Sequence, residues 1–144
     1  MANRTHLLDL NVLIALTWPQ HVHHRRAHEW FGTLTAAWAT TPITEAGFLR
    51  LSTNASVVGE AVPMSQALAM LVDIRGVAGH AFLADASSLA EPSISVDRLV
   101  TPRQVTDVHL VNLAAASGAV LATLDRGIER MLEPADREWV FVLP

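Results

Sequence analysis

Short apolar runs alternate along this chain with longer segments in which apolar positions recur every three or four residues. The short runs predict buried strands, and the longer periodic segments predict amphipathic helices. Strands are expected at Thr5–Leu8, Ala37–Thr41, His80–Leu83, Ala119–Leu124 and Trp139–Leu143. Helices are expected at 9–16, at 22–34, from Pro42 onward, from Pro63 to about Val77, at 106–118 and at 128–132. This alternation predicts an α/β fold with a mainly parallel sheet.

Residues typical of helix ends support several of these boundaries. Pro42 suits the first turn of a helix, Thr106 is a candidate N-cap and Gly118 is a candidate helix stop. The stretch from Asp85 to Pro102 lacks such periodicity. We expect it to be a surface connection that contains at most one short helix.

The composition narrows the class of protein. The chain has 144 residues, of which 51% are hydrophobic and 17% are charged, so it can bury the core of one domain over residues 1–144. It contains no cysteine, which excludes disulfides and thiolate zinc sites, and its ten basic residues are all arginine. Without lysine, P-loop and Schiff-base enzymes are excluded. The net charge of −4 argues against a broad basic surface, and no segment suits a signal peptide or membrane anchor, so a cytoplasmic location is expected.

Four acidic residues occupy positions at which an α/β protein places its chemistry. Asp9 and Asp125 directly follow predicted strands, and Glu45 and Asp107 lie in the first turn of predicted helices. Sites in parallel sheets lie beyond the carboxyl ends of the strands, so these acids are expected to share one edge. Two carboxylates about 5 Å apart repel by roughly 3 kcal/mol at an effective dielectric constant near 20. Because no lysine can offset that repulsion, a divalent cation such as Mg²⁺ is the expected partner.

Each acid also has a purely structural interpretation. Asp9 can cap the helix that follows it, and Asp125 can start a turn. Glu45 and Asp107 can interact with the dipole of a helix N-terminus. The joint position of all four residues near predicted strand ends is what favours a metal site.

Four segments around these acids resemble, in order, the acidic motifs of PIN-domain ribonucleases. They are Leu7–Leu13, Thr41–Leu51, Gln104–Leu110 and Leu121–Gly127. The resemblance covers nearly the whole chain. Within that superfamily, the chain length and the run from Thr44 to Asn54 are similar to the VapC toxins of bacterial toxin/antitoxin pairs.

The resemblance implies a three-layer α/β/α fold and an endoribonuclease that depends on Mg²⁺ or Mn²⁺ and is the toxin of a type II pair. It also implies a homodimer and inhibition by a VapB-type antitoxin. By the same resemblance, the three core acids are Asp9, Glu45 and Asp107, and the fourth acid is Asp125. The polar supports near the metal are Asn11 and Thr123. The expected reaction is attack of water on an RNA phosphodiester, with Asp9 and Asp107 nearest the cation and Glu45 and Asp125 bound directly or through water.

Three arginines near these motifs are candidates for contacts with RNA phosphates. They are Arg50, Arg103 and Arg126. Arginine suits phosphate recognition, but each of these residues also fits an ordinary solvated surface position.

Two other functions fit parts of the sequence. His24 and His28, spaced i, i+4 in a predicted helix, could ligate zinc, although the glutamate of a zinc protease motif and a further well-spaced ligand are missing. Alternatively, the chain is a binding or dimerisation module without turnover, in which apolar side chains face a partner helix instead of the core. Those side chains are Trp18, Trp30, Phe31, Phe48, Leu49 and Leu51.

Overall fold

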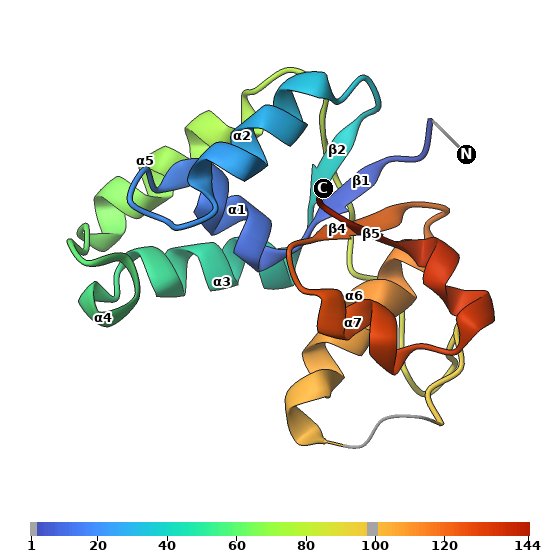
Figure 1. The fold of residues 1–144 in the computed structure, drawn as a ribbon. Helices are drawn as coiled ribbons and strands as arrows, with labels where there is room; N and C mark the ends of the chain where they lie inside the picture. Colours follow the sequence, from blue (N-terminus) through green and yellow to red (C-terminus); the bar gives the residue numbers. More distant parts are fainter. Residues whose placement is uncertain (1–2, 98–100) are drawn as a thin grey trace.

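The computed structural model describes residues 3–97 and 101–144 (Figure 1). Within these ranges five strands form one sheet in the order β3-β2-β1-β4-β5, and all neighbouring strands are parallel. The strands are β1 (His6–Leu8), β2 (Trp38–Thr40), β3 (His80–Phe82), β4 (Val120–Thr123) and β5 (Val140–Val142). Each lies inside one of the five segments that the apolar runs predict.

Seven α-helices and two 3-10 helices connect the strands within the described residues. The α-helices are α1 (Leu10–Thr17), α2 (His24–Thr33), α3 (Pro42–Ser52), α4 (Ala55–Val58), α5 (Met64–Arg75), α6 (Val105–Ala116) and α7 (Arg126–Met131). The 3-10 helices are η1 (Pro102–Gln104) and η2 (Pro134–Trp139). The sequence pattern predicts all of them except α4, η1 and η2.

Side chains alternate across the sheet and bury two separate cores. Leu7 and Leu121 face one core, which α6 and α7 cover. Leu8 and Trp38 face the other core, to which α1, α2, α3 and α5 contribute. Figure 1 shows α1 to α5 on one side of the sheet and α6 and α7 on the other. This is the expected three-layer α/β/α architecture with a parallel sheet.

The two ends of α6 differ in how well the sequence predicts them. The N-cap prediction at Thr106 is wrong, because a capping box formed by Thr101 and Gln104 starts a 3-10 turn that runs directly into α6. The stop at Gly118 is confirmed. Gly118 has a φ of +66°, and the Ala119 N–H donates to the carbonyl of Ala114 at 2.8 Å, as in a Schellman motif.

The irregular connection before α6 is attached to the core. Residues 85–97 contain no helix, and residues 98–100 of the predicted connection lie outside the described residues. Ile94 is buried in the core that α6 covers, and the Ser93 N–H donates to Asn112 Oδ1 at 2.7 Å. The His109 ring contacts the Asp85 carboxylate at 2.8 Å. The expectation of a surface connection is nevertheless confirmed for residues 85–97, which are exposed or partly exposed except for the buried Ile94.

The six apolar side chains considered for a partner surface pack inward. Trp30 and Phe48 are 6% and 0% exposed, and the other four are partly buried against the same core. Among the apolar side chains that are exposed, Met64, Leu68 and Val72 lie on α5 with an i, i+4, i+8 spacing. Among the described helices, none is both long and apolar enough to cross a bilayer.

Candidate active site

The order of the sheet reverses between β1 and β4. From β1 the chain adds β2 and β3 on one side, and it then returns to the other side of β1 with β4 and β5. Loops that leave two such strands diverge, which opens a crevice beyond their carboxyl ends. Asp9 directly follows β1, and Asp125 lies two residues after β4. The topology therefore brings both acids to this crevice.

A cavity of about 370 Å³ at this place is lined by three carboxylates. They belong to Asp9, Asp107 and Asp125, and the Asn11 side chain joins the same wall. Asp107 comes from the first turn of α6, which lies on the other face of the sheet from α1. The structure thus gathers three of the four predicted acids and one of the two predicted polar supports in one hollow.

Both carboxylate oxygens of Asp9 are held by hydrogen bonds. The Leu10 N–H donates to Oδ1 and the Thr123 hydroxyl donates to Oδ2, each at 2.7 Å. The Leu10 contact also makes Asp9 the N-cap of α1, so the expectation that Asp9 caps this helix is confirmed as well. Asp9 is only 5% exposed, and this burial raises its pKa, against the lowering effect of the Thr123 and Leu10 hydrogen bonds.

Thr123 and Asn11 connect the loop after β4 to α1. The Thr123 hydroxyl accepts hydrogen bonds from Asn11 Nδ2 at 3.2 Å and from the Asp125 N–H at 3.1 Å while it donates to Asp9. Asn11 Oδ1 accepts a hydrogen bond from the Leu124 N–H at 3.1 Å. Neither side chain is free to rotate without breaking these bonds. The pair therefore fixes the relative positions of Asp9 and Asp125.

Asp107 and Asp125 differ in burial. Burial, followed by the negative charges of Asp9 and Asp125, raises the pKa of Asp107 to about 6. Asp125 is exposed, and its Oδ1 accepts a hydrogen bond from the Gly127 N–H at 2.8 Å as the N-cap of α7. The three carboxylates thus repel one another across the cavity.

Replacing Asp107 by Asn is expected to stabilise the metal-free protein above neutral pH. A carboxyl whose pKa is higher in the folded than in the unfolded chain makes the wild-type free energy of unfolding fall as the pH rises from about 4 to about 6. Because Asp107 is partly exposed and screened by solvent, we expect a gain of only ~1 kcal/mol. Urea unfolding with a chelator at about pH 8 and pH 4.5 measures this gain. A larger gain at the lower pH would contradict the expected electrostatic cause.

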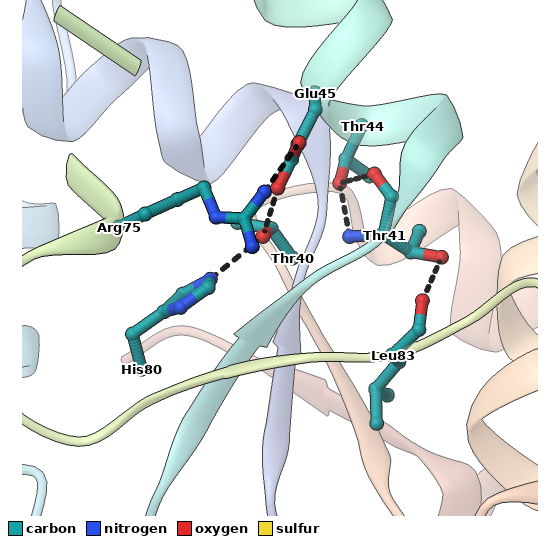
Figure 2. A network of polar contacts seen from close by, with 7 residues as sticks. All are labelled: Thr40, Thr41, Thr44, Glu45, Arg75, His80 and Leu83. Atoms are coloured by element: carbon teal, nitrogen blue, oxygen red, sulfur yellow. Dashed lines mark hydrogen bonds and ion pairs between the residues drawn. The ribbon is translucent and has the colours of Figure 1, made fainter. Parts of the chain in front are cut away.

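Glu45 lies at the same edge of the sheet but is absent from the wall of this cavity. Its Oε2 accepts a hydrogen bond from the Thr40 hydroxyl at 2.6 Å, and its Oε1 lies 3.5 Å from Arg75 Nη1 (Figure 2). Thr40 Oγ1 also lies 2.8 Å from Nε2 of His80, whose pKa is lowered by burial and then by the Arg75 charge. Glu45, one of the three predicted core acids, is therefore held in a separate polar network.

The three candidate arginines are all exposed. Arg50 is in the last turn of α3, Arg103 is in η1 and Arg126 begins α7 directly after Asp125. These positions are accessible to a polyanion, and contact with RNA phosphates stays a prediction.

His24 and His28 bind backbone carbonyls of α1. His24 Nδ1 lies 2.7 Å from the Ala15 oxygen and His28 Nε2 lies 2.8 Å from the Leu16 oxygen. A carbonyl oxygen can only accept, so each ring donates through that nitrogen. This arrangement attaches α2 to the end of α1, and it accounts for both histidines without a metal.

Several residues around the site were not selected from the sequence. His21 lines the acidic cavity, and Thr40, Arg75 and His80 surround Glu45. Thr40 is the last residue of β2 and the last but one of the predicted strand, so the rule that selected the acids could have selected it too. His80 and Thr40 are 40 positions apart, and no local pattern indicates that they meet.

The chain is similar to ribonucleases of Mycobacterium tuberculosis. It is 48% identical over 123 residues to Ribonuclease VapC38, a match that covers 85% of this chain and 86% of that protein. It is 46% identical over 126 residues to Ribonuclease VapC39, covering 86% and 91%, respectively. It is 35% identical over 127 residues to Ribonuclease VapC29, covering 88% and 90%. No family model matches the chain.

Proposed function

This chain belongs to the VapC ribonuclease family, and we propose on that basis that it is an endoribonuclease dependent on Mg²⁺ or Mn²⁺ and the toxin of a type II toxin/antitoxin pair. The observation that carries the proposal is the single cavity, at the reversal of the sheet order, that gathers Asp9, Asp107 and Asp125. The ribonuclease relatives support RNA as the substrate class.

The donors in this cavity fit a hard divalent cation. Carboxylate oxygens are ligands that Mg²⁺ and Mn²⁺ prefer. In residues 3–97 and 101–144 no group of three His, Cys, Asp or Glu side chains could hold a metal ion by itself. Mg²⁺ is commonly held by one or two carboxylates, with water and substrate phosphate completing its shell, so a partial set of protein ligands suits it. Asp9 and Asp107 would lie nearest the ion, with Asp125 bound directly or through water and Glu45, which is absent from the cavity wall, bound through water.

The chain's own residues prepare the site for hydrolysis. When bound, the cation polarises the scissile phosphate and lowers the pKa of a water molecule. Leu10 and Thr123 orient Asp9 through its two oxygens, so the carboxylate is in place before substrate arrives. The water oxygen would form a bond to phosphorus and lose a proton to solvent, while the bond from phosphorus to the leaving ribose oxygen breaks and that oxygen takes up a proton from solvent. Arg50, Arg103 and Arg126 would hold neighbouring phosphates of the RNA.

Protein partners form the second part of the proposal. A VapB-type antitoxin would inhibit the enzyme, and two copies of the chain would form a homodimer. The exposed apolar side chains of Met64, Leu68 and Val72 on α5 support the existence of such a protein contact. Size-exclusion chromatography with light scattering tests the dimer, for which a monomer at micromolar concentration is the contrary result.

Incubation of the purified, partner-free chain with structured RNA and Mg²⁺ tests the proposed activity. We expect discrete cleavage products, because an endonuclease selects particular sites in a folded RNA. Several unrelated RNAs are used because any single RNA can lack the site that the enzyme recognises. If the whole panel stays intact, the chain is a binding module that retains the fold without turnover.

Replacing His24 by Ala is expected to leave RNA cleavage unchanged. The ring contacts the Ala15 carbonyl and takes no part in the acidic cavity, so its loss should cost about 1 kcal/mol of folding stability at most. Cleavage rates and thermal unfolding of this variant check the prediction. A zinc hydrolase that used His24 and His28 would show the reverse pattern, with activity lost here and kept on replacement of Asp9.

A further inference from the structure

Two residues outside the acidic motifs hold the two oxygens of the Glu45 carboxylate. Thr40 donates to Oε2 at 2.6 Å, and Arg75 Nη1 lies 3.5 Å from Oε1 (Figure 2). The Glu45 side chain is 13% exposed and Thr40 is fully buried. Rotation of the carboxylate would therefore leave the buried Thr40 hydroxyl without its acceptor, a cost that solvent cannot offset.

The number of available protons fixes the direction of the hydrogen bonds in this network. A carboxylate only accepts, so the single hydroxyl proton of Thr40 is used on Glu45. The contact of 2.8 Å between Thr40 Oγ1 and His80 Nε2 then requires that His80 donate. A neutral ring can donate there only as the Nε2–H tautomer. The resulting chain runs from His80 through Thr40 to Glu45 Oε2.

The outer members of the network are fixed by packing across strands. His80 pairs with Trp38 in the parallel ladder between β2 and β3, and the two rings meet edge to face with centroids 4.8 Å apart. Trp38 is itself held by a hydrogen bond of 3.0 Å from its Nε1 to the Ala78 carbonyl. The Arg75 guanidinium lies over the ring of Phe82, 4.8 Å from its centroid. The donors therefore approach Glu45 from rigid elements.

We propose that Thr40, His80 and Arg75 are positioning residues for the ribonuclease reaction, which hold the Glu45 carboxylate in one orientation at the active edge of the sheet. This inference rests on the proposed function. The Thr40 contact is short and buried, whereas the Arg75 side chain is 44% exposed and its ion pair is screened by solvent. Thr40 and His80 should therefore contribute more than Arg75.

Thr40→Val is the most informative variant, because valine keeps the shape of threonine and removes only the hydroxyl. We expect kcat for RNA cleavage to fall about 10- to 100-fold, as for the loss of groups that orient active-site ligands, with KM changed by less than about 3-fold. Thr40→Ser keeps the hydroxyl and should restore most of kcat. A residue with only a structural role would not show this split between kcat and KM or this rescue.

A second pair of variants tests the chain at His80. His80→Phe keeps an aromatic ring against Trp38 but cannot donate, and His80→Gln can place an N–H near the position of Nε2. We expect kcat to fall in the Phe variant and to recover in the Gln variant. Since His80 is partly exposed, this pair also serves if Thr40→Val fails to fold. Nitrogen NMR of wild-type His80 should independently show the Nε2–H tautomer.

The outcomes separate this inference from the proposed function. If folded Thr40→Val and His80→Phe both cleave RNA at the wild-type rate, the inference is overturned and the ribonuclease proposal stays intact. The Nδ1–H tautomer at His80 would also overturn it. A wild-type chain that cleaves no RNA would overturn both the proposed function and this inference.

Discussion

Replacing Asp9 by Asn is expected to reduce RNA cleavage by on the order of 10³-fold, because a metal ion typically contributes several kcal/mol to such a reaction. Asp9 is the most enclosed acid of the cavity, and hydrogen bonds hold both of its oxygens. Asparagine has the same shape but no charge. It also turns an N–H₂ group toward either the Leu10 N–H or the Thr123 hydroxyl, and Thr123 already accepts two hydrogen bonds. We therefore expect the variant to bind the cation more weakly and to orient the substrate less precisely.

Asp73→Asn is the matched control for this variant. Asp73 is an exposed acid on α5, away from the acidic cavity, so the same chemical change there should leave the cleavage rate at the wild-type level. Circular dichroism establishes that both variants are folded. Wild-type activity in folded Asp9→Asn would contradict the assignment of Asp9, and an equal loss in Asp73→Asn would point to a general effect of net charge.

Removal of divalent cations is expected to abolish cleavage, and added Mg²⁺ or Mn²⁺ should restore it. Three acidic residues line one cavity, and the pKa of Asp107 is raised by burial and then by the charges of Asp9 and Asp125. Below about pH 6 a proton competes with the cation for Asp107, so the Mg²⁺ concentration for half-maximal rate should fall as the pH rises through this value. Cleavage rates measured with EDTA and then with graded Mg²⁺ at several pH values provide the test.

Two results would contradict this expectation. Full activity in excess EDTA would show that the carboxylates act without a cation. Restoration of cleavage by Zn²⁺ alone would favour nitrogen ligands and hence a zinc site at His24 and His28, although both rings bind carbonyls of α1.

The sheet and the central part of the site were predictable from the sequence because their signals are local. Each strand is a short apolar run, and the acids that follow β1 and β4 come to the point where the order of the sheet reverses. The Gly118 stop is equally local, since the positive φ of a Schellman motif favours glycine. In such cases the residue type and its immediate neighbours determine the structure.

The remaining features depend on contacts between distant segments. Glu45 could be placed at the start of a helix, but the direction of its side chain is set by Thr40 and by Arg75 on α5. The irregular connection is attached to the core by Ile94, for which the sequence shows no periodic pattern. Helix α4 was missed for a different, local reason, because its four residues are too few for a periodic signal and only the Asn54 cap marks its start.

Titration of the metal-free protein with Mn²⁺ tests most directly whether the acidic cavity is a cation site. Calorimetry on the wild-type chain, Asp9→Asn and Asp73→Asn would measure binding without any dependence on the choice of RNA. We predict saturable binding to the wild type and to Asp73→Asn, and binding that is abolished or strongly weakened in Asp9→Asn. Equal Mn²⁺ affinity in all three proteins, or no saturable binding to the wild type, would contradict the proposed site.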